Sequence, residues 1–330
     1  MNETFEAFVV NKTDATFSTN IQNLILDDLS DGDVLIKVAY SSVNYKDALA
    51  SSENGKVASS YPLVPGIDLA GTVVSSNTDR FREGDQVIAT SYDIGVAHNG
   101  GYSEYARIPA EWIVPLPQGL SVKEAMIYGT AGFTAALSVN RLEDNGLIPQ
   151  KGKVLVTGAT GGVGSLAVAM LAKKGYHVVA STGKQSEKEY LRSLGAKEII
   201  SREDVYDGQV KPLDKEQWAG VIDPVGGEPL ASVLSKVQYN GSVAVSGLTA
   251  GVQVPTTVFP FILRGINLLG IDSVNCPMEM RKKVWQRLST DLKLDNLDEI
   301  VEKEIPLSEL PANLTSILKG NIRGRILVKL

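Results

Sequence analysis

The chain has 330 residues, of which 43% are hydrophobic and 21% are charged. At roughly 100–200 residues per domain, this length predicts two domains, and the composition excludes a disordered, collagen-like or coiled-coil protein. A formal net charge of −6 argues against a dedicated binder of nucleic acid or anionic membrane. A single cysteine, Cys276, and two histidines, His98 and His177, exclude a disulfide framework, a cysteine-rich metal site and a three-histidine site.

The sequence carries no signature of membrane insertion or secretion. No stretch approaches the roughly 20 apolar residues that cross a bilayer. The acidic residues 1–6 lack the basic and apolar regions of a secretory signal. We therefore expect a soluble, cytoplasmic protein with neither a membrane nor a nucleic acid as partner; the composition by itself names no function.

The first third of the chain is predicted to be β-rich. Three segments read as strands beside turns of Gly, Asn and Asp: residues 34–40, 69–74 and 86–89. Short strands of this kind favour a small barrel or a partly open sheet. The pattern changes at Ser121, which has the spacing of a capping box with Glu124. A helix of small residues is predicted over 129–142.

From Lys151 onward, short apolar segments alternate with amphipathic ones. The predicted strands are 153–157, 177–180, 198–200, 219–222, 242–246 and 266–271. The predicted helices between them are 163–173, 187–194 and 228–236. Strands separated by helices indicate βαβ units in a doubly wound parallel sheet that is buried on both faces.

The tail is predicted to form two helices and a final strand. Pro277 is expected at the first position of a helix over 278–289. A second helix is expected over 307–318, and a strand over 325–329 returns to the first domain.

The strongest motif is a glycine turn after the first strand of the αβ pattern. The segment 158–164 reads Gly-Ala-Thr-Gly-Gly-Val-Gly. Glycines let main-chain amides approach a pyrophosphate at the start of a helix, where unpaired N–H groups and the helix dipole favour an anion. The motif departs from G-x-G-x-x-G because Ala159 stands in the place of the first glycine. Its setting predicts a dinucleotide site, with a packing turn as the alternative.

The end of the second strand favours NADPH over NADH. A site that selects NAD carries an acid about 20 residues after the turn, whereas here the chain continues with Ser181, Thr182, Gly183 and Lys184. Hydroxyls and a lysine suit a 2′-phosphate, and Arg202 can approach from the next strand. Charge-assisted hydrogen bonds of this kind contribute about 1.5–3 kcal/mol each. The alternative is that Lys184 and Arg202 are solvated surface charges.

Together with five further motifs, these features resemble the medium-chain dehydrogenase/reductase superfamily. The motifs are Asn-Tyr-Lys-Asp at 44–47 and the segments 65–71, 129–135, 223–227 and 260–265. More narrowly, the chain is similar to the zinc-independent quinone oxidoreductase branch. Residues 260–265 and 270–274 resemble its YhdH/YhfP-type subgroup, which includes acrylyl-CoA reductases. The resemblance covers essentially the whole chain.

This resemblance implies a GroES-like catalytic domain and a Rossmann domain, with NADPH in the cleft between them and a homodimer joined through the Rossmann sheets. The expected domains are 1–125, completed by about 290–330, and 126–289. Cofactor contacts are carried over to Tyr45, Thr160, Gly161, Gly162, Val163, Ser181, Thr182, Gly183, Arg202, Leu248, Ile262, Ser273 and Arg325.

The resemblance also implies chemistry without a metal. Zinc-dependent members carry Cys and His where Asn44 and Ile67 stand here, so no tetrahedral zinc site is expected. The acceptor must then already be electrophilic: a quinone, an enone or an acrylyl-CoA-like thioester. Hydride addition to a conjugated alkene leaves negative charge on the carbonyl oxygen, which needs a donor. Asn44 and Tyr45 are the candidate catalytic residues; the alternative is a polar turn with a half-buried tyrosine.

Five other residues are given structural interpretations. Asp47 is expected to lock its loop, and Asp68 to be a turn or hydrogen-bond anchor. His177 is expected to be structural, and Cys276 to be a packed thiol. His98 lies in a glycine loop, where a structural role is favoured over a substrate contact.

Two classes of function remain open. The first is an NADPH-dependent enoyl or quinone oxidoreductase. The alternative is a NADPH-binding sensor or structural protein with little catalytic activity. The residues do not decide between acrylyl-CoA, a quinone and another enone, nor do they identify the proton donor or the dominant 2′-phosphate ligand.

Overall fold

The computed structural model describes residues 4–330, so residues 1–3 of the segment read as lacking a signal lie outside it. The chain forms two compact units. Unit 1 consists of the residues through Thr130 together with Val274–Ser289 and Asn296–Leu330, and unit 2 consists of Ala131–Ser273 and Thr290–Asp295. Within residues 4–330, none of the helices combines the length and apolar character that a bilayer crossing requires.

The strands of unit 1 are β1 (Phe5–Lys12), β2 (Phe17–Leu24), β3 (Val34–Ser42), β4 (Asp68–Ser76), β5 (Gln86–Thr90), β6 (Tyr105–Ile108), β7 (Ile113–Pro115), β14 (Val301–Pro306) and β15 (Arg325–Lys329). Its α-helices are α1 (Tyr45–Ala50), the start of α2 (Val122–Asp144), α8 (Met278–Leu288) and α9 (Leu310–Leu318). Its 3-10 helices are η1 (Leu26–Asp28), η2 (Ala110–Trp112), η5 (Leu297–Ile300) and η6 (Leu307–Glu309).

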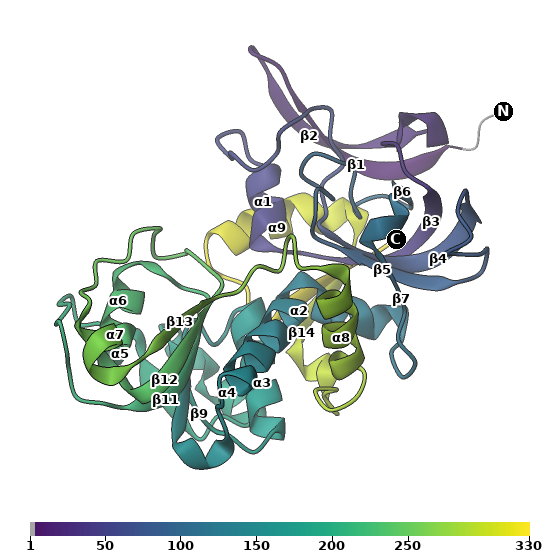
Figure 1. Cartoon of the computed structure of the whole chain (residues 1–330). Helices are drawn as coiled ribbons and strands as arrows, with labels where there is room; N and C mark the ends of the chain where they lie inside the picture. The colour runs from purple at the N-terminus through teal and green to yellow at the C-terminus, as the bar shows by residue number, and fades with distance from the viewer. Residues whose placement is uncertain (1–3) are drawn as a thin grey trace. The chain divides into compact units, whose positions relative to one another are not determined.

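The main sheet of unit 1 joins the C-terminal strands β14 and β15 to β3, from the first part of the chain (Figure 1). Its strand order is β14-β15-β3-β4-β5-β7, with β6 also paired to β3, while β1 and β2 form a separate hairpin. Leu327 of β15 lies opposite Ser42 of β3 in an antiparallel pair. The predicted return of the final strand to the first domain is therefore confirmed, as are the three predicted β-rich segments.

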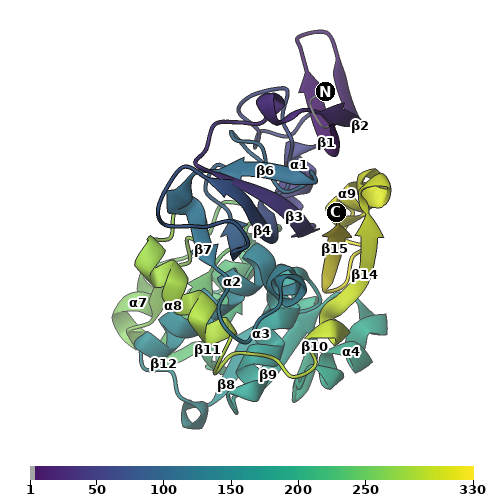
Figure 2. The ribbon, with the colours of Figure 1, turned by 90° about the vertical axis from the view of Figure 1, so that its right-hand side faces the viewer.

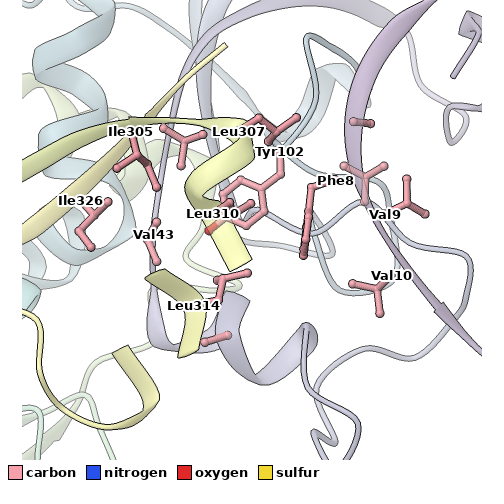
Figure 3. Close-up of a cluster of buried hydrophobic side chains, with 14 residues drawn as sticks. Phe8, Val9, Val10, Val43, Tyr102, Ile305, Leu307, Leu310, Leu314 and Ile326 are labelled. Atoms are coloured by element: carbon pink, nitrogen blue, oxygen red, sulfur yellow. The ribbon is translucent and has the colours of Figure 1, made fainter. Parts of the chain in front are cut away.

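The hydrophobic core of unit 1 is built from both termini. Figure 3 shows Phe8 and Tyr102 facing Leu310, with Ile326 and Val43 nearby in the same cluster. In Figure 2 the yellow C-terminal elements β14, β15 and α9 lie together. Because side chains of this size contribute about 1.5–3 kcal/mol each when buried, the C-terminal segment belongs to the fold of unit 1 rather than being an appendage.

Unit 2 contains a six-stranded sheet flanked by helices (Figure 1). Its strands are β8 (Lys153–Val156), β9 (His177–Thr182), β10 (Glu198–Ser201), β11 (Trp218–Asp223), β12 (Val237–Val245) and β13 (Asn267–Gly270). Its helices are the rest of α2, α3 (Gly162–Lys173), α4 (Lys188–Ser193), α5 (Arg202–Val205), α6 (Gly227–Lys236) and α7 (Phe259–Arg264), with 3-10 helices η3 (Pro149–Lys151) and η4 (Gln185–Glu187).

The order β10-β9-β8-β11-β12-β13 is that of a doubly wound dinucleotide-binding sheet, and every pair of neighbours is parallel. All six predicted strands and the three predicted helices of this region are present. The short helices α5 and α7 were not predicted from the sequence.

Three details differ from the sequence-based expectations. The helix expected to start at Gly129 is part of α2, which begins at Val122 and is interrupted at Gly129, where φ is 50° and ψ is −155°. Pro277 is the N-cap of α8, one position earlier than expected, because its ψ of 139° is extended.

The third difference concerns residues 274–289, which we expected in the second domain and which pack in unit 1. The fully buried Arg281 donates from Nη1 to the Thr90 carbonyl oxygen at 3.1 Å and lies over the ring of Tyr92. These contacts join segments nearly 200 residues apart, which the sequence pattern does not reveal. The capping box is confirmed, since Ser121 N donates to Glu124 Oε2 at 2.8 Å.

Candidate functional site

The glycine turn links β8 to α3, and three of its glycines have different structural roles. Gly158 makes the turn in a left-handed conformation with φ of 54°, one residue before the position assigned to the first glycine of the motif. At Gly164 an added Cβ would lie 2.7 Å from Ala159 Cα, so glycine is needed there for the helix to approach the strand. At Gly161, the N-cap of α3, the nearest atom to an added Cβ is the Gly158 carbonyl oxygen at 3.4 Å. A side chain at 161 would therefore fit the fold and enter the space in front of the helix.

A buried carboxylate supports this turn from the neighbouring strand. Asp223, at the end of β11, accepts a hydrogen bond from Thr157 Oγ1 at 2.6 Å and another from Gly226 N at 2.7 Å. The pKa of Asp223 is raised above its ordinary value, because the effect of burial outweighs these hydrogen bonds, which lower it. Sequence reasoning did not assign this role, because Asp223 entered only as part of a family motif.

Three of the residues predicted for the 2′-phosphate, Ser181, Thr182 and Arg202, lie at the ends of β9 and β10, and Lys184 is the N-cap of η4. Ser181 and Thr182 are buried at the end of β9, and Ser181 Oγ donates to the Ser201 carbonyl oxygen at 3.3 Å. The Arg202 guanidinium lies directly against Gly183, where a Cβ would collide with it. The Arg202 side chain nevertheless keeps 71% of its surface exposed. It therefore stays accessible to an anion at the end of β9, while its Nε lies 3.9 Å from the exposed Glu203 Oε1.

A second feature lies at the carboxyl ends of β12 and β13. An open pocket of about 480 Å³ is lined by residues 245–248 and 270–272, including the predicted cofactor residue Leu248. Within residues 4–330, the buried Oγ of Ser246 has no hydrogen-bond partner. Ser273 is the next residue in the sequence after those that line this pocket. Ile262 lies in α7 and keeps 69% of its surface accessible. In doubly wound sheets this edge is where ligands bind.

In unit 1, the two candidate catalytic residues differ in what they offer to a substrate. Asn44 is the N-cap of α1 and is buried. Its Nδ2 donates to Asp68 Oδ2 at 2.8 Å and to Asp47 Oδ2 at 3.1 Å, while its Oδ1 accepts from Arg325 Nη1 at 3.1 Å. Tyr45, the first residue of α1, keeps 40% of its surface exposed. The amide of Asn44 is thus engaged inside the protein, and Tyr45 faces outward.

Arg325, at the start of β15, is buried in the same cluster. Its guanidinium donates to the carbonyl oxygens of Ile127 and Val43 and to Ser42 Oγ, and it lies 3.7 Å from Asp68 Oδ2. The pKa of Arg325 is lowered from its ordinary value, because the effect of burial outweighs the opposing effect of the nearby Asp68. The cofactor contact implied by resemblance for Arg325 stays a prediction, while its contacts inside unit 1 are extensive.

Two buried carboxylates accompany this arginine. Asp68 accepts from Ser42 Oγ at 2.6 Å, from Thr130 N at 2.9 Å and from Thr130 Oγ1 at 2.5 Å. Asp47 accepts from Ile67 N at 2.8 Å and from Asn44 N at 2.9 Å. Burial, with a smaller effect of Asp68, raises the pKa of Asp47 to about 7. The locking role expected for Asp47 and the anchoring role expected for Asp68 are both seen.

The remaining candidates occupy structural positions. Both ring nitrogens of His98 lie 2.8 Å from backbone carbonyl oxygens, those of Asn99 and Asp31. His177 pairs with Glu198 at 2.7 Å on the surface. The Cys276 thiol is buried and packed.

Comparison with known proteins identifies the family to which this architecture belongs. Residues 30–118 match the alcohol dehydrogenase GroES-like domain, and residues 162–290 match the zinc-binding dehydrogenase family. Acrylyl-CoA reductase AcuI of Ruegeria pomeroyi is 48% identical, with 98% of each chain covered. The chain belongs to the quinone oxidoreductase branch of the medium-chain dehydrogenase/reductase superfamily.

Two solved structures are similar over essentially their full length. The Bacillus subtilis protein YhfP, solved with NAD bound, is 61% identical with a TM-score of 0.97, and 99% of this chain and 100% of that chain are covered. YhdH of Escherichia coli K-12, solved with NADPH bound, is 47% identical with a TM-score of 0.94, and the coverage is 98% and 99%. The expected combination of a GroES-like domain and a Rossmann domain is confirmed.

Proposed function

We propose that this member of the branch is an NADPH-dependent, zinc-independent oxidoreductase that reduces a conjugated acceptor, either an enoyl thioester, an enone or a quinone. The observation that carries the proposal is the exposed Arg202 guanidinium in contact with Gly183, the residue that follows Ser181 and Thr182 at the end of β9. A site built for NAD places a carboxylate at the end of this strand. A cation and hydroxyls at the same place suit the 2′-phosphate of NADPH instead.

The glycine turn fits the rest of a dinucleotide. The amides of Gly162 and Val163 open α3, a helix of 12 residues, so its N-terminus supplies donors and a positive dipole end to a diphosphate, while the Gly161 amide donates to the Gly158 carbonyl oxygen at 3.0 Å within the turn. The space in front of Gly161 is where a side chain would stand, and Gly164 allows the close approach of helix and strand. Among the relatives, YhdH was solved with NADPH bound and AcuI is named an acrylyl-CoA reductase, whereas YhfP was solved with NAD bound. The preference for NADPH therefore rests on the residues at the end of β9 and not on the names of the relatives.

When bound, NADPH supplies the hydride. On the acceptor side, Tyr45 is the better donor of the two candidates, because its phenol group belongs to a side chain with 40% of its surface exposed. A phenol O–H can stabilise negative charge that develops on a carbonyl or quinone oxygen. Asn44 acts indirectly, because its amide bonds to Asp68, Asp47 and Arg325.

The proposal is tested by initial rates of NADPH oxidation at 340 nm with acrylyl-CoA, a simple enone and a simple quinone. At least one acceptor is expected to be reduced, and NADPH is expected to be used in preference to NADH. Tight NADPH binding without turnover of any of these acceptors would favour a sensor or structural protein instead.

Changing Lys184 to glutamate is expected to weaken NADPH binding by about 10- to 100-fold and to change NADH binding less than about threefold. The expected loss corresponds to one charge-assisted contact of about 1.5–3 kcal/mol with a 2′-phosphate that NADH lacks. Fluorescence titration with each cofactor measures the two affinities. Lys188→Glu makes the same charge change at the start of α4 and serves as the control. An equal response of the two cofactors to Lys184→Glu would remove the phosphate role of this lysine.

We further propose a homodimer joined through β13. This strand is an edge of the parallel sheet, and among residues 4–330 its one strand partner is β12. Its Leu268 and the neighbouring Ile262 and Leu263 of α7 are 40%, 69% and 58% exposed. An open edge with apolar neighbours favours pairing with a second copy about a two-fold axis.

Leu268→Lys is expected to convert the dimer to a monomer, because a charge on the edge strand opposes strand pairing. Light scattering coupled to size-exclusion chromatography measures the mass, and Val74→Lys, on another exposed strand position, is the control. A wild-type mass of one chain would rule out the dimer.

A further inference from the structure

We propose that Asp68 is a positioning residue. Its carboxylate holds the Asn44–Tyr45 segment in the conformation in which Tyr45 can contact the hydride acceptor. The inference rests on the function proposed above, and it concerns a residue whose side chain has no exposed surface. Asp68 opens β4 and is fully buried. Its carboxylate accepts hydrogen bonds from Ser42, Asn44 and Thr130, so it links three segments of unit 1.

The first set of donors comes from the strand that leads into α1. Ser42 Oγ, at the end of β3, donates to Asp68 Oδ2 at 2.6 Å. Arg325 Nη2 donates to the same Ser42 Oγ at 2.7 Å and lies 3.7 Å from Asp68 Oδ2. The Ser42 hydroxyl is therefore hydrogen-bonded to both the Asp68 carboxylate and the Arg325 guanidinium. These two bonds fix the end of β3, two residues before Asn44.

The second donor is Asn44 itself, and Asp68 determines how its amide is oriented. Nδ2 points to Asp68 Oδ2 and Asp47 Oδ2, while Oδ1 points to Arg325 Nη1. A flipped amide would place its oxygen against two carboxylate oxygens and its NH₂ against a guanidinium. Only one orientation is compatible with both the Asp68 carboxylate and the Arg325 guanidinium. Because Asn44 is the N-cap of α1, this orientation sets the residue from which Tyr45 starts the helix.

The third set comes from the interruption of α2. Gly129 adopts φ of 50°, and a Cβ there would collide with Asp68 Oδ2 and Arg325 Nη2. The interruption turns Thr130 toward the carboxylate, so that Thr130 N and Thr130 Oγ1 both donate to it, the latter at 2.5 Å. Ser91 Oγ lies 3.1 Å from Thr130 Oγ1 and extends the network to the end of β5. The carboxylate thus ties the Tyr45 segment to two further elements of unit 1.

Two variants test this proposal in the full-length protein. Asp68→Asn keeps the size of the side chain but turns an NH₂ group toward donors. Thr130→Val removes one hydroxyl donor, keeps the shape and leaves the carboxylate in place, so it serves if Asp68→Asn does not fold. Thr130→Ser restores the hydroxyl. The control is Asp85→Asn, which makes the same change as Asp68→Asn in an exposed turn of unit 1.

The first readout is independent of activity: hydrogen exchange of the backbone amides of residues 44–50, followed by mass spectrometry. We expect exchange there to be at least about tenfold faster in both variants, because the lost hydrogen bonds hold this segment. Exchange in β8 and α3 of unit 2 should match the wild type, as should that of Asp85→Asn and Thr130→Ser. Unchanged exchange at 44–50, or equally faster exchange in unit 2, would overturn the proposal.

The second readout separates positioning from mere stability. With an acceptor that the wild type reduces, kcat is expected to fall about 10- to 100-fold in Asp68→Asn and about 5- to 10-fold in Thr130→Val. The KM for the acceptor and the Kd for NADPH should change less than about threefold. Wild-type kcat in a folded Asp68→Asn would overturn the positioning role, whereas an inactive wild type with the expected exchange pattern would overturn only the proposed function.

Discussion

Gly161→Val is expected to abolish NADPH binding while leaving the protein folded. An added Cβ at 161 meets only the Gly158 carbonyl oxygen, at 3.4 Å, so the fold accommodates it. The branched side chain then occupies the space in front of the α3 N-terminus, where a diphosphate must contact bare amides. We expect a loss of affinity of more than about 100-fold, since several hydrogen bonds to a charged group are lost together, each worth about 1.5–3 kcal/mol. Fluorescence titration with NADPH and NADH measures the loss, and both cofactors should be affected alike.

Two companion variants show whether the effect arises from the binding surface or from the fold. Ala169→Val places the same side chain on the same helix, two turns away from the glycine turn, and should bind NADPH normally. Gly164→Ala should instead lower the melting temperature, because its Cβ would lie 2.7 Å from Ala159 Cα. Normal NADPH affinity in Gly161→Val would show that the dinucleotide does not rest on this turn.

The second large effect concerns the pH dependence of stability. The pKa of Asp47 is raised to about 7 in the folded protein, from its ordinary value of 3.8. Between these two values the folded chain holds a proton that the unfolded chain has released. The contribution of this group is therefore complete below the unfolded pKa, and it is lost as the pH rises through the folded pKa. The free energy of unfolding should fall by up to about 1.4 kcal/mol per pH unit between the two pKa values, which amounts to about 2 kcal/mol between pH 5 and pH 7 because the slope flattens near the folded pKa.

Asp47→Asn removes this titration and should flatten the pH dependence by that amount. Urea unfolding at pH 5, 6, 7 and 8, followed by circular dichroism, gives the difference between wild type and variant at each pH. Asp85→Asn, on an exposed turn, should keep the wild-type slope. A wild-type minus Asp47→Asn difference that stays constant across this range would contradict the assignment.

Asp47 and Asp68 illustrate how two carboxylates in one buried cluster differ. Asp68 receives donors from three segments and lies beside Arg325. Asp47 receives its hydrogen bonds from Ile67 and Asn44, and burial outweighs them, so that its pKa rises. The cluster therefore contains one guanidinium with two carboxylates, and Asp47 is the member whose protonation changes near neutral pH.

The Rossmann half of the molecule could be predicted in detail from the sequence. Its strands are continuous apolar segments and its helices are amphipathic, so the hydrophobic period marks each element locally. The glycine turn and the Ser181–Lys184 segment follow strands directly, and their position on the sheet follows from that connectivity. The structure adds the contact between Arg202 and Gly183, which brings together two predicted residues that are 19 positions apart.

The polar cluster of unit 1 could be decided only by the tertiary structure. Asp68 and Asn44 are 24 residues apart, and Arg325 is a further 257 residues along the chain. Their neighbourhood depends on β15 pairing with β3 and on the break of α2 at Gly129. Neither the strand pairing nor the helix break has a periodic signature in the sequence. The buried charges are stabilised by partners far along the chain rather than by residues of their own segment, so a local pattern does not reveal them. Local pattern thus determined the elements and the dinucleotide turn, while long-range pairing decided that Asn44 is held internally and that Tyr45 is left exposed.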